Sequence, residues 1–125
     1  MDSKSLALLC RKLAENRKAE EVVILDMRKV STIADYFVIA TGSSDPHLRA
    51  IGEEITTRLK QDEGLSPRAV DGSFQASWRV LDYFDVIVHI MKPEARNHYD
   101  LESLWGDAPH VRPHARPLGT KKKAV

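Results

Sequence analysis

Residues able to do chemistry or to bind a partner gather between positions 78 and 89, in a stretch otherwise typical of paired β-strands. An indole, a phenol, carboxylates, a guanidinium and an imidazole follow one another there among branched apolar residues. A buried strand favours none of the charges, because a charged group loses its hydration when it enters a core. The polar groups therefore either carry out a reaction or present a surface to a partner.

A nucleotide site is the first reaction that the sequence suggests, at Gly42 and Ser43. These residues end an apolar run and precede a helix, and free amides at such a turn can cradle a phosphate. Neither a G-x-x-x-x-G-K-[ST] nor a G-x-G-x-x-G pattern is present. A tight turn in which Gly42 takes a positive φ explains the same residues, and we favour that interpretation.

Metal binding and hydrolysis have less support in the pattern. Asp82 and Asp85 could bind Mg²⁺ together with Asp26 or Asp35, but carboxylates also bound and solvate the ends of strands. No nucleophile-elbow pattern accompanies the serines. We therefore expect no catalytic residue, no metal and no cofactor.

Aromatic anchoring is the interpretation that we favour for residues 78–85. Binding hot spots are rich in Trp, Tyr and Arg, and charges at the rim set the orientation of the partner. We expect Trp78, Tyr83 and Phe84 to lie close together where two strands meet. A Trp78 that belongs to the ordinary core is the alternative. The predicted partner-binding residues are Trp78, Arg79, Asp82, Tyr83, Phe84 and Asp85.

The composition restricts the class of protein. The chain has 125 residues, one cysteine and a formal net charge of +1. That length suits one domain, and the near-neutral charge gives no general attraction to nucleic acid or membranes. The single thiol, Cys10, excludes an internal disulfide, suits a reducing compartment and is expected to be buried. No apolar run is long enough to cross a bilayer and no leader pattern is present, so we expect a cytoplasmic protein.

The first elements that position these residues follow from the hydrophobic pattern. Residues 3–19 have apolar positions at helical spacing, with Ser3 or Ser5 as the N-cap. Residues 22–27 form a continuous run of β-branched residues, which predicts a central strand buried on both faces. A second strand of the same kind begins at residue 35.

A second helix is predicted from residue 46 to residue 63 by its punctuation. Asp45 can cap the free amides, Pro46 suits the first helical position, and Gly64 provides the stop. Gly52 inside this helix indicates close packing on the sheet, since glycine costs about 1 kcal/mol relative to alanine there.

The remaining chain predicts three short strands, at residues 68–71, 77–82 and 84–91, followed by a short helix that ends in Leu101, Leu104 and Trp105. The predicted fold is therefore a mixed α/β sheet flanked by helices, in the order helix, two strands, helix, three strands, short helix. The domain should span residues 1–106. Prolines and a lysine run predict a disordered basic tail over residues 107–125.

Three blocks, ADYFVIATGSSDPHLRAI, SWRVLDYFDVIVHIM and ARNHYDLESLW, resemble in this order the ribosomal silencing factor family, also called the Iojap family. The resemblance covers nearly all of the chain up to Trp105. It implies a nucleotidyltransferase-like α/β fold without transferase activity. The sequence agrees with that implication, because a transferase needs two spaced acidic residues after the Gly-Ser turn, whereas Glu53 and Glu54 are adjacent.

The resemblance also implies a function. Members of this family bind the fourteenth ribosomal protein of the large ribosomal subunit, on the face that meets the small subunit, and thereby stop the subunits from joining. We therefore expect a translational repressor that acts in the stress response. Carried over by position, Trp78 is the interface tryptophan, and Asp82, Tyr83 and Asp85 lie in the adjoining motif.

Two positions depart from the pattern of the family. Phe84 stands where the family usually has glycine, which enlarges the apolar contact or alters the turn. The stretch SSDPH replaces a more usual Ser-Arg-His, which removes a basic group and leaves Arg49 as a substitute.

Other partners and functions stay open at this point. The alternative function is a nucleotide-binding enzyme of the same fold that uses the Gly42 and Ser43 turn. Lys121, Lys122 and Lys123 could add a minor, salt-sensitive contact with ribosomal RNA phosphates. A homodimer formed through a sheet edge is a further possibility.

Overall fold

A computed structural model of the chain describes residues 1–71 and 77–111. The predicted RNA contact at Lys121, Lys122 and Lys123 lies outside the described residues. Among the helices of the described part, none combines the length and the apolar character needed to cross a membrane. The elements are α1 (Ser3–Asn16), β1 (Glu20–Asp26), β2 (Tyr36–Thr41), α2 (Asp45–Glu63), β3 (Ala69–Asp71), β4 (Trp78–Asp82), β5 (Val86–Met91), α3 (Pro93–Tyr99) and α4 (Leu101–Leu104).

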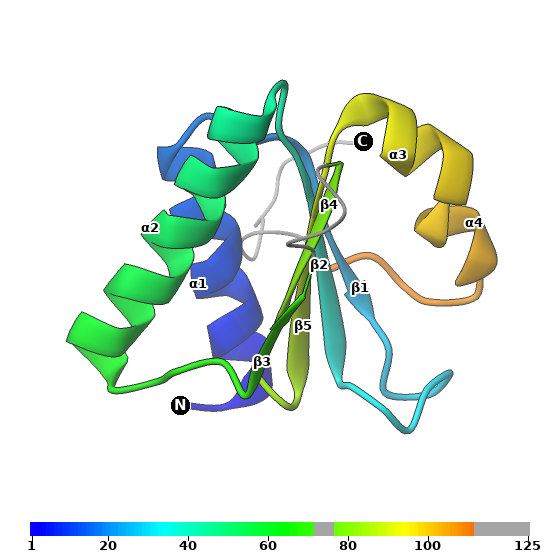
Figure 1. Cartoon of the computed structure of the whole chain (residues 1–125). Helices are drawn as coiled ribbons and strands as arrows, with labels where there is room; N and C mark the ends of the chain where they lie inside the picture. Colours follow the sequence, from blue (N-terminus) through cyan, green and yellow to red (C-terminus); the bar gives the residue numbers. More distant parts are fainter. Residues whose placement is uncertain (72–76, 112–125) are drawn as a thin grey trace, which may run out of the picture.

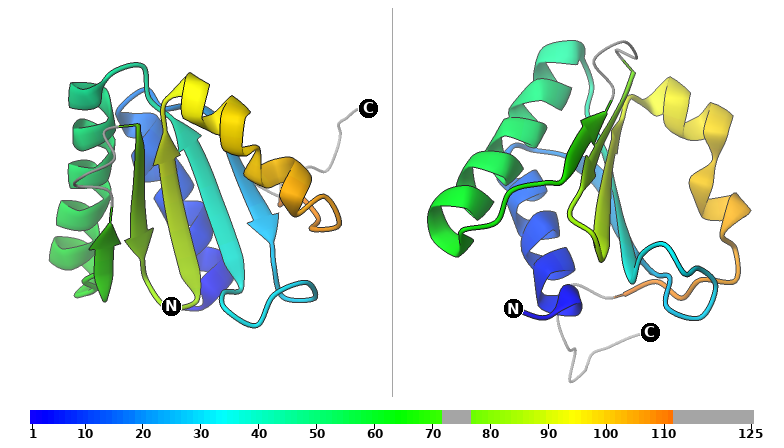
Figure 2. Two further views of the ribbon diagram at one scale, coloured as in Figure 1. Left: turned by 45° about the vertical axis from the view of Figure 1, so that its right-hand side comes forward. Right: turned by 60° about the horizontal axis from the view of Figure 1, so that its bottom comes forward.

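The strands form one mixed sheet in the order β1-β2-β5-β4-β3. β2 and β5 run parallel, while β1 pairs with β2, and β4 with β5 and β3, in antiparallel fashion. Helices α1 and α2 cover one face of the sheet, and α3 and α4 lie on the other (Figures 1 and 2). The predicted mixed sheet with flanking helices is confirmed, except that the last helix is divided into α3 and α4 at Asp100.

The strand β1 lies at the edge of the sheet, so the prediction of a central strand is wrong. The chain that follows α4 returns along its outer side, where Leu25 forms an isolated bridge with His110. The Asp26 amide donates to the Pro109 carbonyl over 2.7 Å. Apolar residues are tolerated at this edge because the returning chain occupies its free hydrogen-bonding groups.

Residues 107–111 pack against the domain, which corrects the predicted start of the tail at residue 107. Ala108 is buried, and the Val111 amide donates to the Ile24 carbonyl over 2.7 Å. The rest of the predicted tail, residues 112–125, lies outside the described residues.

Two hydrophobic clusters hold the layers together. The α1–α2 core lies between those helices and the sheet, and includes Cys10, Val38 and Ile90. The α3–α4 core lies on the opposite face and includes Leu25 and Phe37. Cys10 is fully buried as predicted, and burial raises the pKa of its thiol to about 12. The thiolate needed for nucleophilic chemistry is therefore scarce at neutral pH.

The helix caps differ from the predicted ones. Asp2 caps α1 in place of Ser3 or Ser5, and its carboxylate accepts a 2.7 Å hydrogen bond from the Ser5 amide. Ser44 caps α2 in place of Asp45. Extended backbone at Asp2 and Ser44 turns each side chain toward the free amides of the first helical turn. Pro46 is the second residue of the helix, one position later than predicted, and Gly64 ends the helix with a φ of 67°, as predicted.

Gly42 is required for close approach rather than for a positive φ, which corrects the predicted turn. A Cβ added at Gly42 would lie 2.8 Å from Leu48 Cδ2 and 3.2 Å from Ile51 Cδ1. At Gly52 an added Cβ would meet Ile90 Cδ1 at 3.7 Å, an ordinary contact. The two glycines therefore differ in how much room their surroundings leave.

Substitutions to alanine should have opposite effects at these two glycines. Gly42→Ala should lower the free energy of unfolding by about 1–3 kcal/mol, because the new methyl group overpacks a buried site. Gly52→Ala should raise it by up to about 1 kcal/mol, because alanine is the better helix former and has space. Urea unfolding of both variants measures these changes, and equal effects at the two positions would contradict the packing described here.

Candidate partner-binding site

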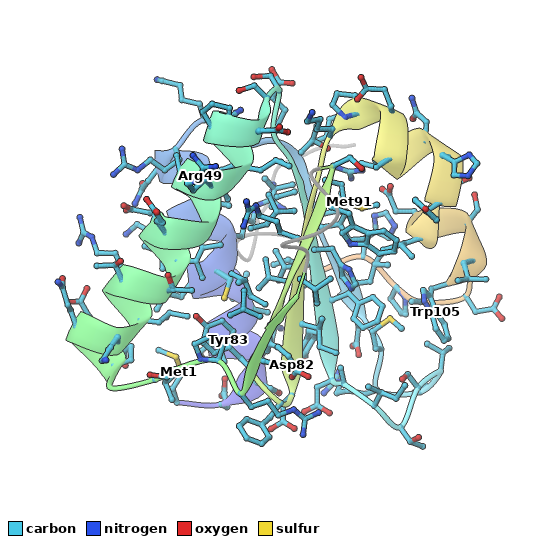
Figure 3. All side chains as sticks on the ribbon, in the orientation of Figure 1. Met1, Arg49, Asp82, Tyr83, Met91 and Trp105 are labelled. Atoms are coloured by element: carbon cyan, nitrogen blue, oxygen red, sulfur yellow. The ribbon has the colours of Figure 1, made fainter. Side chains whose placement is uncertain are left out.

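The alternation of side chains along β4 separates the predicted partner-binding residues. Trp78, Val80 and Asp82 point to the α3–α4 face of the sheet, and Arg79 to the α1–α2 face. Tyr83 also packs in the α1–α2 core and is only 5% exposed. Figure 3 shows Tyr83 on the side of α1 and Trp105 on the side of α4.

The expected single cluster of Trp78, Tyr83 and Phe84 is therefore not formed. Trp78 begins β4, whereas Phe84 lies in the turn beyond its other end. At about 3.3 Å per residue, the Cα atoms of Trp78 and Asp82 are roughly 13 Å apart. We call Trp78, Val80 and Asp82, all half-buried, the β4 surface.

Two contacts hold the indole of Trp78. Its Nε1–H donates to His89 Nδ1 on β5 over 3.2 Å. The ring of Tyr99, from α3, lies beside it with a centroid distance of 4.7 Å. Trp78 is half-buried, so it is neither sealed in the core nor free in solvent. A tryptophan in this state has its orientation set and keeps apolar area that a partner can cover.

His89 is a buried neutral histidine. It is 8% exposed, its ring lies 4.8 Å from that of Phe37, and burial lowers its pKa to about 4. Because indole is only a donor, Nδ1 of His89 accepts and the proton of the neutral ring sits on Nε2. Within the described residues, Nε2 has no hydrogen-bond partner.

The other end of β4 forms a second exposed feature. Asp82 binds Arg68 over 3.0 Å and also accepts a 2.8 Å hydrogen bond from the Phe84 amide. Phe84 is 55% exposed, and the guanidinium of Arg68 lies 4.7 Å from the centre of its ring. The carbonyl of Asp85 accepts from the amides of both Asp35 and Tyr36. This turn therefore joins β3, β2 and the β4–β5 hairpin.

Phe84 has a φ of 71°, in the left-handed region that glycine adopts without steric cost. The backbone explains why glycine suits this position. In the present chain a phenylalanine adopts this strained backbone conformation, and its ring stacks with Arg68 at the surface.

The amides of Gly42 and Ser43 are both already paired within the protein. The Ser43 amide donates to His47 Nδ1 over 2.8 Å, and the Gly42 amide donates to the Met91 carbonyl. His47 Nε2 in turn lies 2.7 Å from the Arg17 carbonyl. His47 therefore ties the end of α1 to the start of α2, which is a structural task.

Three of the four acidic residues considered for Mg²⁺, namely Asp26, Asp35 and Asp82, have other partners. Asp26 pairs with Arg28 over 2.7 Å, and Asp35 accepts a hydrogen bond from the Ser3 hydroxyl. Across residues 1–71 and 77–111, no group of three or more His, Cys, Asp or Glu side chains could hold a metal ion. Arg49, the possible substitute for a missing basic group, projects from α2 (Figure 3), which covers one face of the sheet, whereas Trp78 packs against the α3–α4 core on the other face.

Sequence reasoning missed three residues of this site: Arg68, His89 and Tyr99. The signal for His89 is present in the sequence, because it interrupts the apolar row of β5 on the face that it shares with Ile87 and Met91. Its bond to Trp78 depends on the register of β4 against β5, where Val80 is the neighbour of His89. Nothing in the pattern indicates Arg68 or Tyr99.

Fold and site together define a small α/β domain whose distinctive feature is the β4 surface, with the half-buried Trp78, on one face of its sheet. A family model described as "Ribosomal silencing factor during starvation" matches residues 1–124. The chain belongs to this ribosomal silencing factor family, a family of ribosome-associated translation regulators named for regulation rather than for a reaction.

Individual relatives agree with this assignment. A ribosomal silencing factor from Halalkalibacterium halodurans is 39% identical over 111 residues, which cover 89% of this chain and 94% of the relative. A crystal structure of a Chromobacterium violaceum protein superposes with a TM-score of 0.80 at 27% identity, and the match covers 95% of both chains. A more distant mouse relative, "Mitochondrial assembly of ribosomal large subunit protein 1", is 30% identical over 74% of this chain and 42% of its own length.

Burial of neutral His89 makes stability depend on pH. The unfolded chain gains a proton on this histidine below about pH 6.5, whereas the folded chain resists protonation down to about pH 4. The free energy of unfolding should therefore fall by up to about 3 kcal/mol as the pH drops through that window. Thermal or urea unfolding measured from pH 7 to pH 4 gives the slope of the free energy of unfolding against pH.

His89→Asn should flatten this slope, because the titrating group is gone. The control is His98→Asn, which removes an exposed histidine and should leave the slope unchanged. An identical pH dependence in wild type and His89→Asn would contradict the assignment.

The left-handed backbone at Phe84 gives a second test. Phe84→Gly and Phe84→Ala both remove the ring, so their difference isolates the backbone. The glycine variant should be the more stable by about 1 kcal/mol. The matched pair Lys60→Gly and Lys60→Ala, on the exposed side of α2, should show the opposite order in the same unfolding assay.

Proposed function

We propose that this chain represses translation by binding the large ribosomal subunit through its fourteenth ribosomal protein, which sterically blocks joining of the small subunit. It acts in the cytoplasm when nutrients are short, and it needs neither catalysis nor a cofactor. Membership of the ribosomal silencing factor family supports this proposal. The name of the mouse relative, which refers to assembly of the ribosomal large subunit, supports the choice of subunit.

The single observation that carries the proposal is the half-buried Trp78 on the β4 surface. Its indole is oriented by His89 and Tyr99, yet Trp78 is only partly buried. Tryptophans in such positions are typical anchors, because a partner can complete their burial without ordering a flexible side chain.

Both ends of β4 fit within one interface. A standard interface buries about 800 Å² on each partner, which corresponds to a patch roughly 30 Å across. Trp78 would lie near its centre, while Phe84 and Asp85, in the exposed turn, would lie toward the rim. A bound domain of this size excludes a second large body from the same surface, so occlusion needs no conformational change.

The six predicted residues would contribute in different ways. Trp78, Asp82, Phe84 and Asp85 supply contact area or charge at the surface. Tyr83 is buried in the α1–α2 core, so we assign it a supporting role for the β4–β5 turn. Arg79 points to the opposite face and stays outside the proposed contact area.

Loss of the anchor should weaken binding strongly. Trp78→Ala should weaken binding to purified large ribosomal subunits by at least roughly thirtyfold, since a buried anchor contributes about 2 kcal/mol or more. Co-sedimentation with large subunits measures the loss, and circular dichroism verifies that the variant is folded. Lys60→Ala, on the exposed side of α2, serves as the control and should bind normally.

Subunit joining tests the mechanism itself. Wild-type protein, added to large subunits before small subunits, should reduce the light-scattering increase that accompanies formation of the full ribosome. Trp78→Ala should leave that increase intact. Normal joining in the presence of saturating wild-type protein would rule out occlusion even if the protein binds.

A further inference from the structure

We propose that His89 is a positioning residue for partner binding, which holds the Trp78 indole in its docking orientation through the hydrogen bond to Nδ1. The inference rests on the proposed function, in which Trp78 is the anchor. It assigns a role to a residue that makes no contact with the partner itself.

The position of His89 is fixed by its surroundings. It lies in β5, a strand whose residues are all buried, between the neighbouring strands β2 and β4. Ile39 and Val80 are its partners across those strands. Trp78 pairs with Met91, so His89 is its diagonal neighbour on the same face. Diagonal neighbours are within reach of aromatic side chains.

The hydrogen bond has only one possible direction. Indole Nε1–H is a donor and cannot accept, so the bond requires an acceptor at Nδ1 of His89. Tyr99 packs beside the same indole with ring centroids 4.7 Å apart. One polar contact and one ring contact from different elements therefore fix the plane of the Trp78 ring.

The alternative is a purely structural role, in which His89 only fills space in the α3–α4 core. Several features argue for more than filling. A leucine or phenylalanine would fill a buried position without the desolvation cost that His89 incurs, and Nε2 has no partner among the described residues to offset that cost. The hydrogen bond to Trp78 is the one polar contact of the imidazole in this part of the chain.

A set of substitutions at His89 separates the two roles. Leucine fills the buried position with an apolar side chain of moderate size and provides no hydrogen-bond acceptor. Asparagine places its amide oxygen near the former Nδ1, and glutamine places its amide near the former Nε2. If the position of the hydrogen-bond acceptor matters, asparagine should rescue the function of Trp78, whereas leucine and glutamine should not.

The first measurement needs no partner. In a Trp105→Phe background, Trp78 is the only tryptophan of the full chain, so its indole N–H gives a single NMR signal. Hydrogen exchange of that N–H should be slow in the parent and in His89→Asn, and at least roughly tenfold faster in His89→Leu and His89→Gln, because the acceptor is lost.

The second measurement is affinity for purified large ribosomal subunits. His89→Leu should bind roughly tenfold more weakly, since the partner must then order a free indole. His89→Asn should restore most of that loss. In a Trp78→Phe background, which lacks the N–H, His89→Leu should cause no further loss, because the two residues act through one bond.

The two proposals fail in different ways. If Trp78→Ala binds normally while the exchange of the indole N–H still responds to His89, the docking function is wrong and the hydrogen bond stands. If Trp78→Ala abolishes binding but His89→Leu leaves exchange and affinity unchanged, the positioning role is overturned. Should His89→Leu fail to fold, Trp78→Phe supplies the test, and full affinity in that variant also overturns the role.

Discussion

The parallel pairing of β2 with β5 is the contact on which the rest of the structure depends. Both strands are buried along their whole length, and they lie side by side from Tyr36 and Val86 to Thr41 and Met91. Backbone hydrogen bonds fasten both ends: the Asp85 carbonyl accepts from the Tyr36 amide at the start, and the Gly42 amide donates to the Met91 carbonyl at the finish. Since parallel strands need a long crossover, α2 and the β3–β4 hairpin follow β2 before β5 can begin.

This central pair gives the two faces of the sheet different properties. On one side, α1 and α2 close over an apolar core that also takes up Tyr83. On the other side, His89 brings a polar ring into the buried layer, and the register of β4 places the donor of Trp78 within its reach. The same register leaves the indole only half covered. The hydrogen bond between Trp78 and His89 thus connects a buried polar group of the core with the partly exposed indole at the surface.

Local patterns predicted the elements well but not their neighbours. Helical spacing, the apolar runs and Gly64 indicated the strands and helices in the correct order, apart from the division of the last helix into α3 and α4. The edge position of β1 could not be predicted, because it depends on the pairing of strands distant in the sequence and on the return of residues 107–111. The caps were misplaced by one to three residues, since several adjacent polar side chains could each reach the free amides.

The candidate site was predicted in part for the same reason. Trp78 was singled out from its residue type and polar neighbours, whereas the separation of Tyr83 from it follows from strand alternation past the end of β4. The left-handed backbone at Phe84 was hidden, because a large side chain gives no local indication of positive φ. His89 showed its signal as a break in an apolar row, but its partner could be found only from the register.

The measurement that tests the central claim most directly is hydrogen–deuterium exchange of the chain free and bound to large ribosomal subunits. Backbone amides of β4, of the turn at Phe84 and of the end of α3 should become protected on binding, while the exposed side of α2 should not change. Protection confined to α1 and α2, with β4 unaffected, would contradict a docking surface centred on Trp78.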